Sequence, residues 1–158
     1  MTPPRISLRP IGDGDPKPHA PSVWDDWGPC DPEAMALPMR RWLVELHGPD
    51  GEAMPVGDVS AHTVWYGPTP GSRAMNIGIS ILEEHRGRGI GSTAQRLLAE
   101  LLHAEGIARV EAQTDVENLP EQRALARAGF LLEGTARRAQ QRADGLHDLQ
   151  VWSHVAGP

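Results

Sequence analysis

The chain has 158 residues and a formal net charge of −6, which predicts one domain over residues 1–158 with a substantial core. The acidic balance argues against nucleic acid or an anionic membrane as the main partner. A single cysteine, Cys30, excludes an intramolecular disulfide and a thiolate metal cluster, and the histidines show no metal-ligand spacing, so no metal is expected. No apolar leader or membrane-spanning run is visible, and a cytoplasmic location is expected.

The first half of the chain is predicted to form four strands around a loop-rich segment. Alternating or continuous apolar residues place the strands at residues 6–11, 42–47, 54–65 and 75–82. Residues 12–40 are rich in Pro, Gly and Asp and predict a loop with at most short helices.

The second half predicts two helices and three strands. The leucines around residues 97–102 recur at helical spacing, and Gly106 is expected to end this helix. A fifth strand is expected near residues 110–114, and a second helix begins at Asn118, whose spacing from Glu121 is typical of a capping box. Residues 130–142 and 146–155 then predict a hairpin. These elements indicate an α/β fold with a mixed sheet. Arg137, Arg138 and Arg142 are expected on a solvated strand face.

The most informative motif is the glycine-rich run from 86 to 92, which lies between the fourth strand and the first helix. Its residues are Arg86, Gly87, Arg88, Gly89, Ile90, Gly91 and Ser92. Glycines allow tight turns that point backbone N–H groups at one spot, and a helix N-terminus adds unpaired donors and a positive dipole end. The run therefore predicts a phosphate or diphosphate site, with the arginines closing over the anion. It lacks the pattern of a P-loop or of a dinucleotide fingerprint.

Two ordered motifs resemble the GNAT superfamily of acetyl-CoA-dependent N-acetyltransferases. Arg86, Gly89 and Gly91 match its cofactor motif, and the run from Asn118 to Gly129-Phe130 matches its second signature. With the late hairpin, the chain looks most like the RimJ/RimL-type branch. The resemblance implies a GNAT fold: a mostly antiparallel mixed sheet of about seven strands, splayed between the fourth and fifth, with helices on both faces.

The resemblance also implies an activity and a cofactor site. The protein is expected to move an acetyl group from acetyl-CoA directly to a primary amine, on a protein N-terminus or a small molecule, as a monomer or homodimer. Backbone groups of Ile79, Ser80 and Ile81 would pair with the pantetheine arm. The N–H groups from 86 to 92 would hold the diphosphate, and Asn118 would hydrogen-bond the pantetheine portion.

The chain departs from family patterns at the reactive positions. It carries Asn76, Gln113, Glu121, Leu125 and Trp152 where various relatives have Glu, Ser or Tyr. The candidates for a proton relay are Asp58 and His62, which share one face of the third strand by parity.

The segment Trp24-Asp25-Asp26-Trp27 is open to two interpretations. Its indoles could plug the edge of the sheet, or the segment could form the acceptor pocket, with carboxylates that attract a protonated amine. For the whole chain, two alternatives to an enzyme stay open: a catalytically silent acetyl-CoA-binding module, and an interaction or regulatory domain of the same fold.

Overall fold

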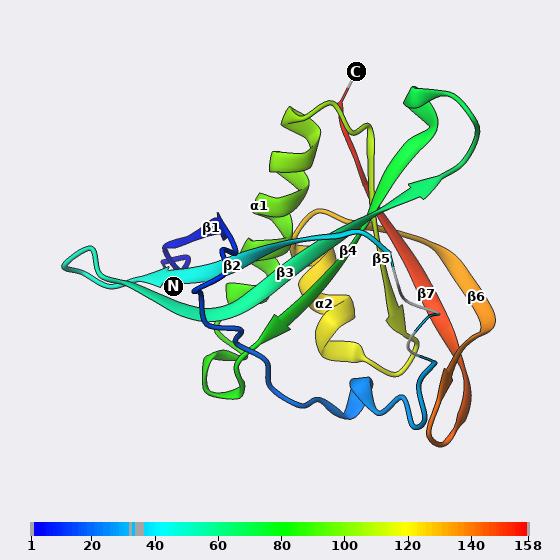
Figure 1. Ribbon diagram of the computed structural model, residues 1–158, viewed down its shortest axis with the longest axis horizontal. Coiled ribbons are helices and arrows are strands. Elements are labelled where there is room, and N and C mark those ends of the chain that lie inside the picture. Colours follow the sequence, from blue (N-terminus) through cyan, green and yellow to red (C-terminus); the bar gives the residue numbers. More distant parts are fainter. Residues whose placement is uncertain (1, 32, 34–36, 158) are drawn as a thin grey trace.

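The computed structural model describes residues 2–31, 33 and 37–157, and its strands form one seven-stranded mixed sheet (Figure 1). Across the sheet the strand order is β1-β2-β3-β4-β5-β7-β6. The β4–β5 pair is parallel, and the other described pairs are antiparallel, as predicted. The strands are β1 (Ile6–Pro10), β2 (Met39–His47), β3 (Ala53–Trp65), β4 (Arg73–Ile81), β5 (Arg109–Asp115), β6 (Leu131–Arg142) and β7 (Gly145–Val155).

Two α-helices make the crossover connections: α1 (Ile90–Ala104) joins β4 to β5, and α2 (Leu119–Arg127) joins β5 to β6. The helices contact each other, because the side-chain amide of Gln95 donates a hydrogen bond to the Glu121 carboxylate. They therefore lie on the same face of the sheet, whereas helices had been expected on both faces. Successive right-handed crossovers that advance in one direction across a sheet place their helices on one side.

The core lies between these helices and the central strands. Helix α1 packs mainly against β1 and β4, and Gly106, with a φ of +88°, follows the helix end as predicted. Burying the apolar stripe of this helix removes most of its apolar area from water, which is the main driving force for this packing. The buried core residues include Val44, Val59, Ile77, Leu98, Leu102, Val110, Leu125 and Phe130.

The sheet opens between β4 and β5. The parallel ladder has three residue pairs, ending at Ile77 and Ala112, although β4 continues to Ile81 and β5 to Asp115. Figure 1 shows the two strands close together at one end and far apart at their carboxyl ends. The splay implied by the family resemblance is thus present.

The long segment before β2 crosses the open end of the sheet (Figure 1). As predicted, it holds little regular structure: its described part contains the single 3-10 turn η1 (Val23–Asp25). Among the described residues, no helix is long and apolar enough to cross a membrane.

Candidate active site

A cleft of about 690 Å³ lies where β4 and β5 separate. Its walls include residues 77–81 of β4 and 112–115 of β5. Beyond Ile77, the backbone of β4 has no strand partner on the β5 side within the described chain. An extended ligand with amide groups can pair with such an edge as an additional strand. Ile79, Ser80 and Ile81, the residues expected to do this, all line the cleft.

At one end of the cleft, the glycine-rich loop presents free backbone donors. Within the described residues, the N–H groups of residues 87–92 have no hydrogen-bond partner, and the first bond of α1 runs from Thr93 N to Gly89 O over 3.1 Å. Gly87 and Gly89 have φ values of +73° and +77°, a region in which a side chain is strained. This run of donors at a helix N-terminus is suited to a diphosphate.

The other residues of this loop differ in what they offer. The guanidinium of Arg86 lines the cleft and donates through Nε to Ile81 O over 2.8 Å, whereas its backbone N–H donates to Glu83 O and is not free for a ligand. Arg88 is exposed and does not line the cleft. Ile90 is buried in the core and contributes its backbone alone. Only one of the two arginines is therefore placed to close over an anion.

Asn118 lies at the opposite wall, where it caps α2. Its Oδ1 accepts a hydrogen bond from Glu121 N over 3.3 Å, which forms half of the predicted capping box. The other half is absent, because the Glu121 side chain accepts from Gln95 instead and Asn118 N donates to Asp115 O. On the same helix Arg123 and Arg127 line the cleft, one helical turn apart, and can contact a phosphate.

Glu121 is a cleft residue whose carboxyl is largely buried. Burial raises the pKa of Glu121 to about 7, and the hydrogen bond from Gln95 opposes this rise. A carboxyl with this pKa is protonated in a sizeable fraction of molecules at neutral pH, and perturbed groups of this kind cluster at functional sites. The spacing from Asn118 predicted that Glu121 belongs to a capping box. The sequence around Glu121 does not indicate that α1 buries its carboxyl, and this burial is what raises its pKa.

The two residues predicted to relay a proton lie outside the cleft walls. Asp58 is buried on β3 and lines a separate cavity of about 90 Å³, with its Oδ2 3.9 Å from Arg41 Nε. Burial raises the pKa of Asp58, and the positive charges of Arg41 and His19 partly offset this. His62 is half-buried opposite Asn76 of β4. The two side chains share one face of β3, as parity requires. Asp58 is paired in register with Ser80 of β4, but neither Asp58 nor His62 lines the cleft.

The tryptophan segment forms part of the far end of the cleft. Trp24, Asp25 and Trp27 line it, whereas Asp26 does not. Both indoles face the guanidinium of Arg142, whose carbon lies 5.7 Å from the Trp24 ring and 5.6 Å from the Trp27 ring. The segment therefore packs against the β6–β7 hairpin and forms part of the cleft wall, and its role as an acceptor pocket stays a prediction.

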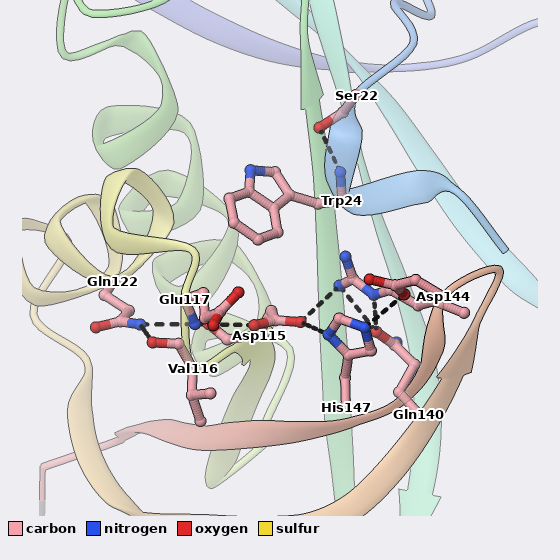
Figure 2. Close-up of polar contacts among 10 residues, drawn as sticks. Ser22, Trp24, Asp115, Val116, Glu117, Gln122, Gln140, Asp144 and His147 are labelled. Carbon is pink, nitrogen blue, oxygen red and sulfur yellow. Dashed lines mark hydrogen bonds and ion pairs between the residues drawn. The ribbon is translucent and has the colours of Figure 1, made fainter.

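Arg142 itself was expected on a solvated face and is instead buried, at 5% exposure. It belongs to a polar network at the carboxyl end of β5, in which Figure 2 shows His147 between Asp115 and Asp144. The Asp115 carboxylate is buried and lies 2.6 Å from His147 Nδ1, while His147 Nε2 lies 2.7 Å from Asp144 Oδ1. These two carboxylates raise the pKa of His147. The network fixes the hairpin against the cleft.

Comparison with known proteins assigns this architecture. Residues 6–131 match the family described as acetyltransferase (GNAT) domain. The chain belongs to the GNAT acetyltransferase family. No curated protein gives a significant match.

Solved structures with the same GNAT fold include RimJ from Mycobacterium smegmatis in complex with CoA-disulfide. It is 28% identical, with 75% of this chain and 53% of that chain covered and a TM-score of 0.62. The microcin C7 self-immunity acetyltransferase MccE, in complex with acetyl-CoA and AMP, is 21% identical over 75% of this chain and 61% of its own, with a TM-score of 0.61. The ribosomal-protein-S5-alanine acetyltransferase from Vibrio fischeri is 22% identical over 74% and 61%, also with a TM-score of 0.61. The GNAT chain described here thus spans between half and two thirds of the length of these relatives.

Proposed function

We propose that this protein transfers the acetyl group of acetyl-CoA to a primary amine, with residues 1–158 acting as one domain. The observation that carries the proposal is the alignment of two ligand-binding surfaces along one cleft: the free N–H groups of residues 87–92 and the unpaired edge of β4. The first fits the diphosphate of coenzyme A and the second fits the amides of its pantetheine arm. Family membership and the ligands of the RimJ and MccE structures support the same co-substrate.

The chemistry requires two proton transfers that the protein has to provide. When bound, acetyl-CoA supplies a thioester carbonyl that a neutral amine attacks, so that a C–N bond forms, the C–S bond breaks and the CoA thiol is released. The amine loses one proton and the sulfur gains one. Backbone N–H groups at the free edge of β4 can stabilise the negative charge that develops on the carbonyl oxygen.

We assign the proton transfer to sulfur to Glu121, the buried carboxyl of the cleft wall. The base stays a prediction. Asp58 and His62 lie outside the cleft walls, so either would act through water. The acceptor pocket is assigned to the end formed by Trp24, Asp25 and Trp27.

One alternative has its own structural support. Leu125 and Trp152, at positions where relatives carry reactive groups, are buried in the core and offer no acid or base to the cleft. This favours a module that binds acetyl-CoA without turning it over.

Calorimetric titration with acetyl-CoA, followed by thiol release across a panel of amines and N-terminal peptides, separates these functions. We expect saturable binding and amine-dependent release of CoA. Binding without release for every amine would establish the silent module, and the absence of binding would refute the cofactor site.

A further inference from the structure

Arg142 is a buried cation in the wall of the cleft, and its carboxylate partner, Asp115, contacts it through one oxygen only. Its guanidinium donates from Nε and Nη2 to a neutral acceptor, Gln140 Oε1, over 3.1 and 3.0 Å. The two indoles of Trp24 and Trp27 face it. Its ion pair, with Asp115, has a separation of 3.5 Å.

Both oxygens of Asp115 also make shorter contacts with other partners. Oδ2 lies 2.6 Å from His147 Nδ1, and Oδ1 accepts from Glu117 N over 2.8 Å. Figure 2 shows the Asp115 carboxylate held between Glu117 on one side and His147 on the other.

Other arginines of the chain are paired much more tightly. Arg40 binds both oxygens of Glu105 at 2.6 and 2.8 Å, and Arg109 binds both oxygens of Glu133 at 2.7 and 2.6 Å. Both are more exposed than Arg142, with side chains 47% and 25% exposed against 6%. Of these three arginines, Arg142 is thus the most buried and is the one that no carboxylate binds through both of its oxygens.

A buried guanidinium in this state is suited to a ligand. Removing a charge from water is costly unless a close opposite charge compensates it, and the planar fork of arginine matches a carboxylate. The cleft wall next to it carries the opposite sign: Asp25 is exposed and lines the same end, where it can attract an ammonium group. The two charges complement a molecule that carries an amine and a carboxylate close together.

We propose that the acceptor is a small amino acid-type molecule whose carboxylate is bound by Arg142. This inference rests on the proposed acetyl transfer. A plain amine would leave the guanidinium with its single 3.5 Å contact to Asp115, and a peptide N-terminus would offer it a neutral carbonyl. Arg142 is thereby a specificity-determining residue of the acceptor pocket.

The test compares matched acceptors: an α-amino acid, its carboxamide, the corresponding decarboxylated amine and a tripeptide with neutral side chains and an amidated C-terminus. Hydrogen bonds to a charged group contribute about 1.5–3 kcal/mol, so kcat/KM for the amino acid is expected to exceed the others by about 10- to 100-fold. Arg142→Met is expected to lower kcat/KM for the amino acid by that factor more than it lowers kcat/KM for the acceptors without a carboxylate. Arg137→Met, at an exposed position of the same strand, is the control and is expected to leave all values unchanged.

Three results would overturn the inference. The first is a wild-type protein that acetylates the amine, the carboxamide or the tripeptide as well as the amino acid, which needs no variant to fold. The second is an Arg142→Met protein that loses all acceptors equally, which would indicate a purely structural role. If acetyl-CoA binds but no acceptor releases CoA, the proposed transfer fails. In that case ligand-observed NMR measures whether the amino acid binds to the CoA-loaded wild-type and Arg142→Met proteins, which tests the carboxylate site separately. The absence of binding to the wild-type protein is the third result that would overturn the inference.

Discussion

Replacing Glu121 with glutamine removes a buried carboxyl while keeping its shape, and the expected effect depends on pH. Burial raises the pKa of Glu121 from its ordinary value of 4.5 to about 7. Because the folded-state pKa lies above the unfolded one, folding takes up a proton between these values, and stability falls as pH rises through that window. With each pKa unit equivalent to 1.36 kcal/mol, the buried carboxylate costs about 3 kcal/mol at about pH 8.5.

The new amide also gains a partner. It can still accept from Gln95 Nε2 and can donate to Gln95 Oε1, a buried oxygen without a partner among the described residues. We therefore expect Glu121→Gln to raise the free energy of unfolding by up to about 3 kcal/mol at about pH 8.5, and to change it little at about pH 5.

Urea denaturation followed by tryptophan fluorescence, repeated across this pH range, measures the difference. Glu117→Gln, at an exposed position two residues before α2, is the matched control and is expected to show no such dependence. The burial of the Glu121 carboxyl would be refuted if Glu121→Gln and the wild type differed in free energy of unfolding by the same amount at both ends of the pH range. A variant that is less stable than the wild type at the alkaline end would also refute it. In the enzyme assay the same Glu121→Gln variant is expected to lower kcat by about 100-fold, with the Kd of acetyl-CoA unchanged.

Three further predictions test the cleft and the core. Gly89→Glu is expected to abolish acetyl-CoA binding in calorimetry while the fold survives, because a Cβ there would make only ordinary contacts with Pro4 and Ser92 and the positive φ costs about 1–2 kcal/mol. Gly89→Ala carries the same backbone cost without the charge and should bind acetyl-CoA more tightly than Gly89→Glu. Asp25→Asn is expected to raise the acceptor KM and leave acetyl-CoA affinity unchanged, whereas Asp26→Asn, outside the cleft, should change neither; equal effects of the two would argue against an acceptor role for Asp25. Burial and the neighbouring His103 lower the pKa of His154, so the stability that depends on neutral His154 is present above about pH 6.5 and is lost as pH falls below it. His154→Gln should flatten this acid dependence in urea titrations, and an unchanged slope would contradict it.

The sequence predicted the elements whose causes are local. The glycine loop, the start of α1 behind it and the end of α1 at Gly106 follow from backbone freedom and helix capping, and the structure confirms them to within a residue or two. The same is true of the Asn118 cap. Strand ends were less exact: β2 begins at Met39 rather than near 42, because pairing with β3 extends the strand beyond its apolar run.

The chemistry of the cleft walls could not be predicted in the same way. Arg137, Arg138 and Arg142 look alike in sequence, and alternation would place Arg138 and Arg142 on one face. An irregularity in pairing between Ala136 and Gln140, with Arg138 at a φ of +52°, leaves Arg138 exposed while Arg142 turns inward. Such irregularities depend on the partner strand, which the local sequence does not report.

The amino-acid sequence by itself determined the strand–loop–helix unit, the glycine-rich run of backbone donors predicted at residues 86–92 and the family, because these depend on backbone conformation over a few neighbouring residues. The tertiary structure alone decided which side chains lose water. α1 buries Glu121, the tryptophan segment covers Arg142, and Asp58 of β3 lines a separate cavity. Solvation and charge pairing set the reactivity of these groups, and both are properties of contacts between residues far apart in the chain.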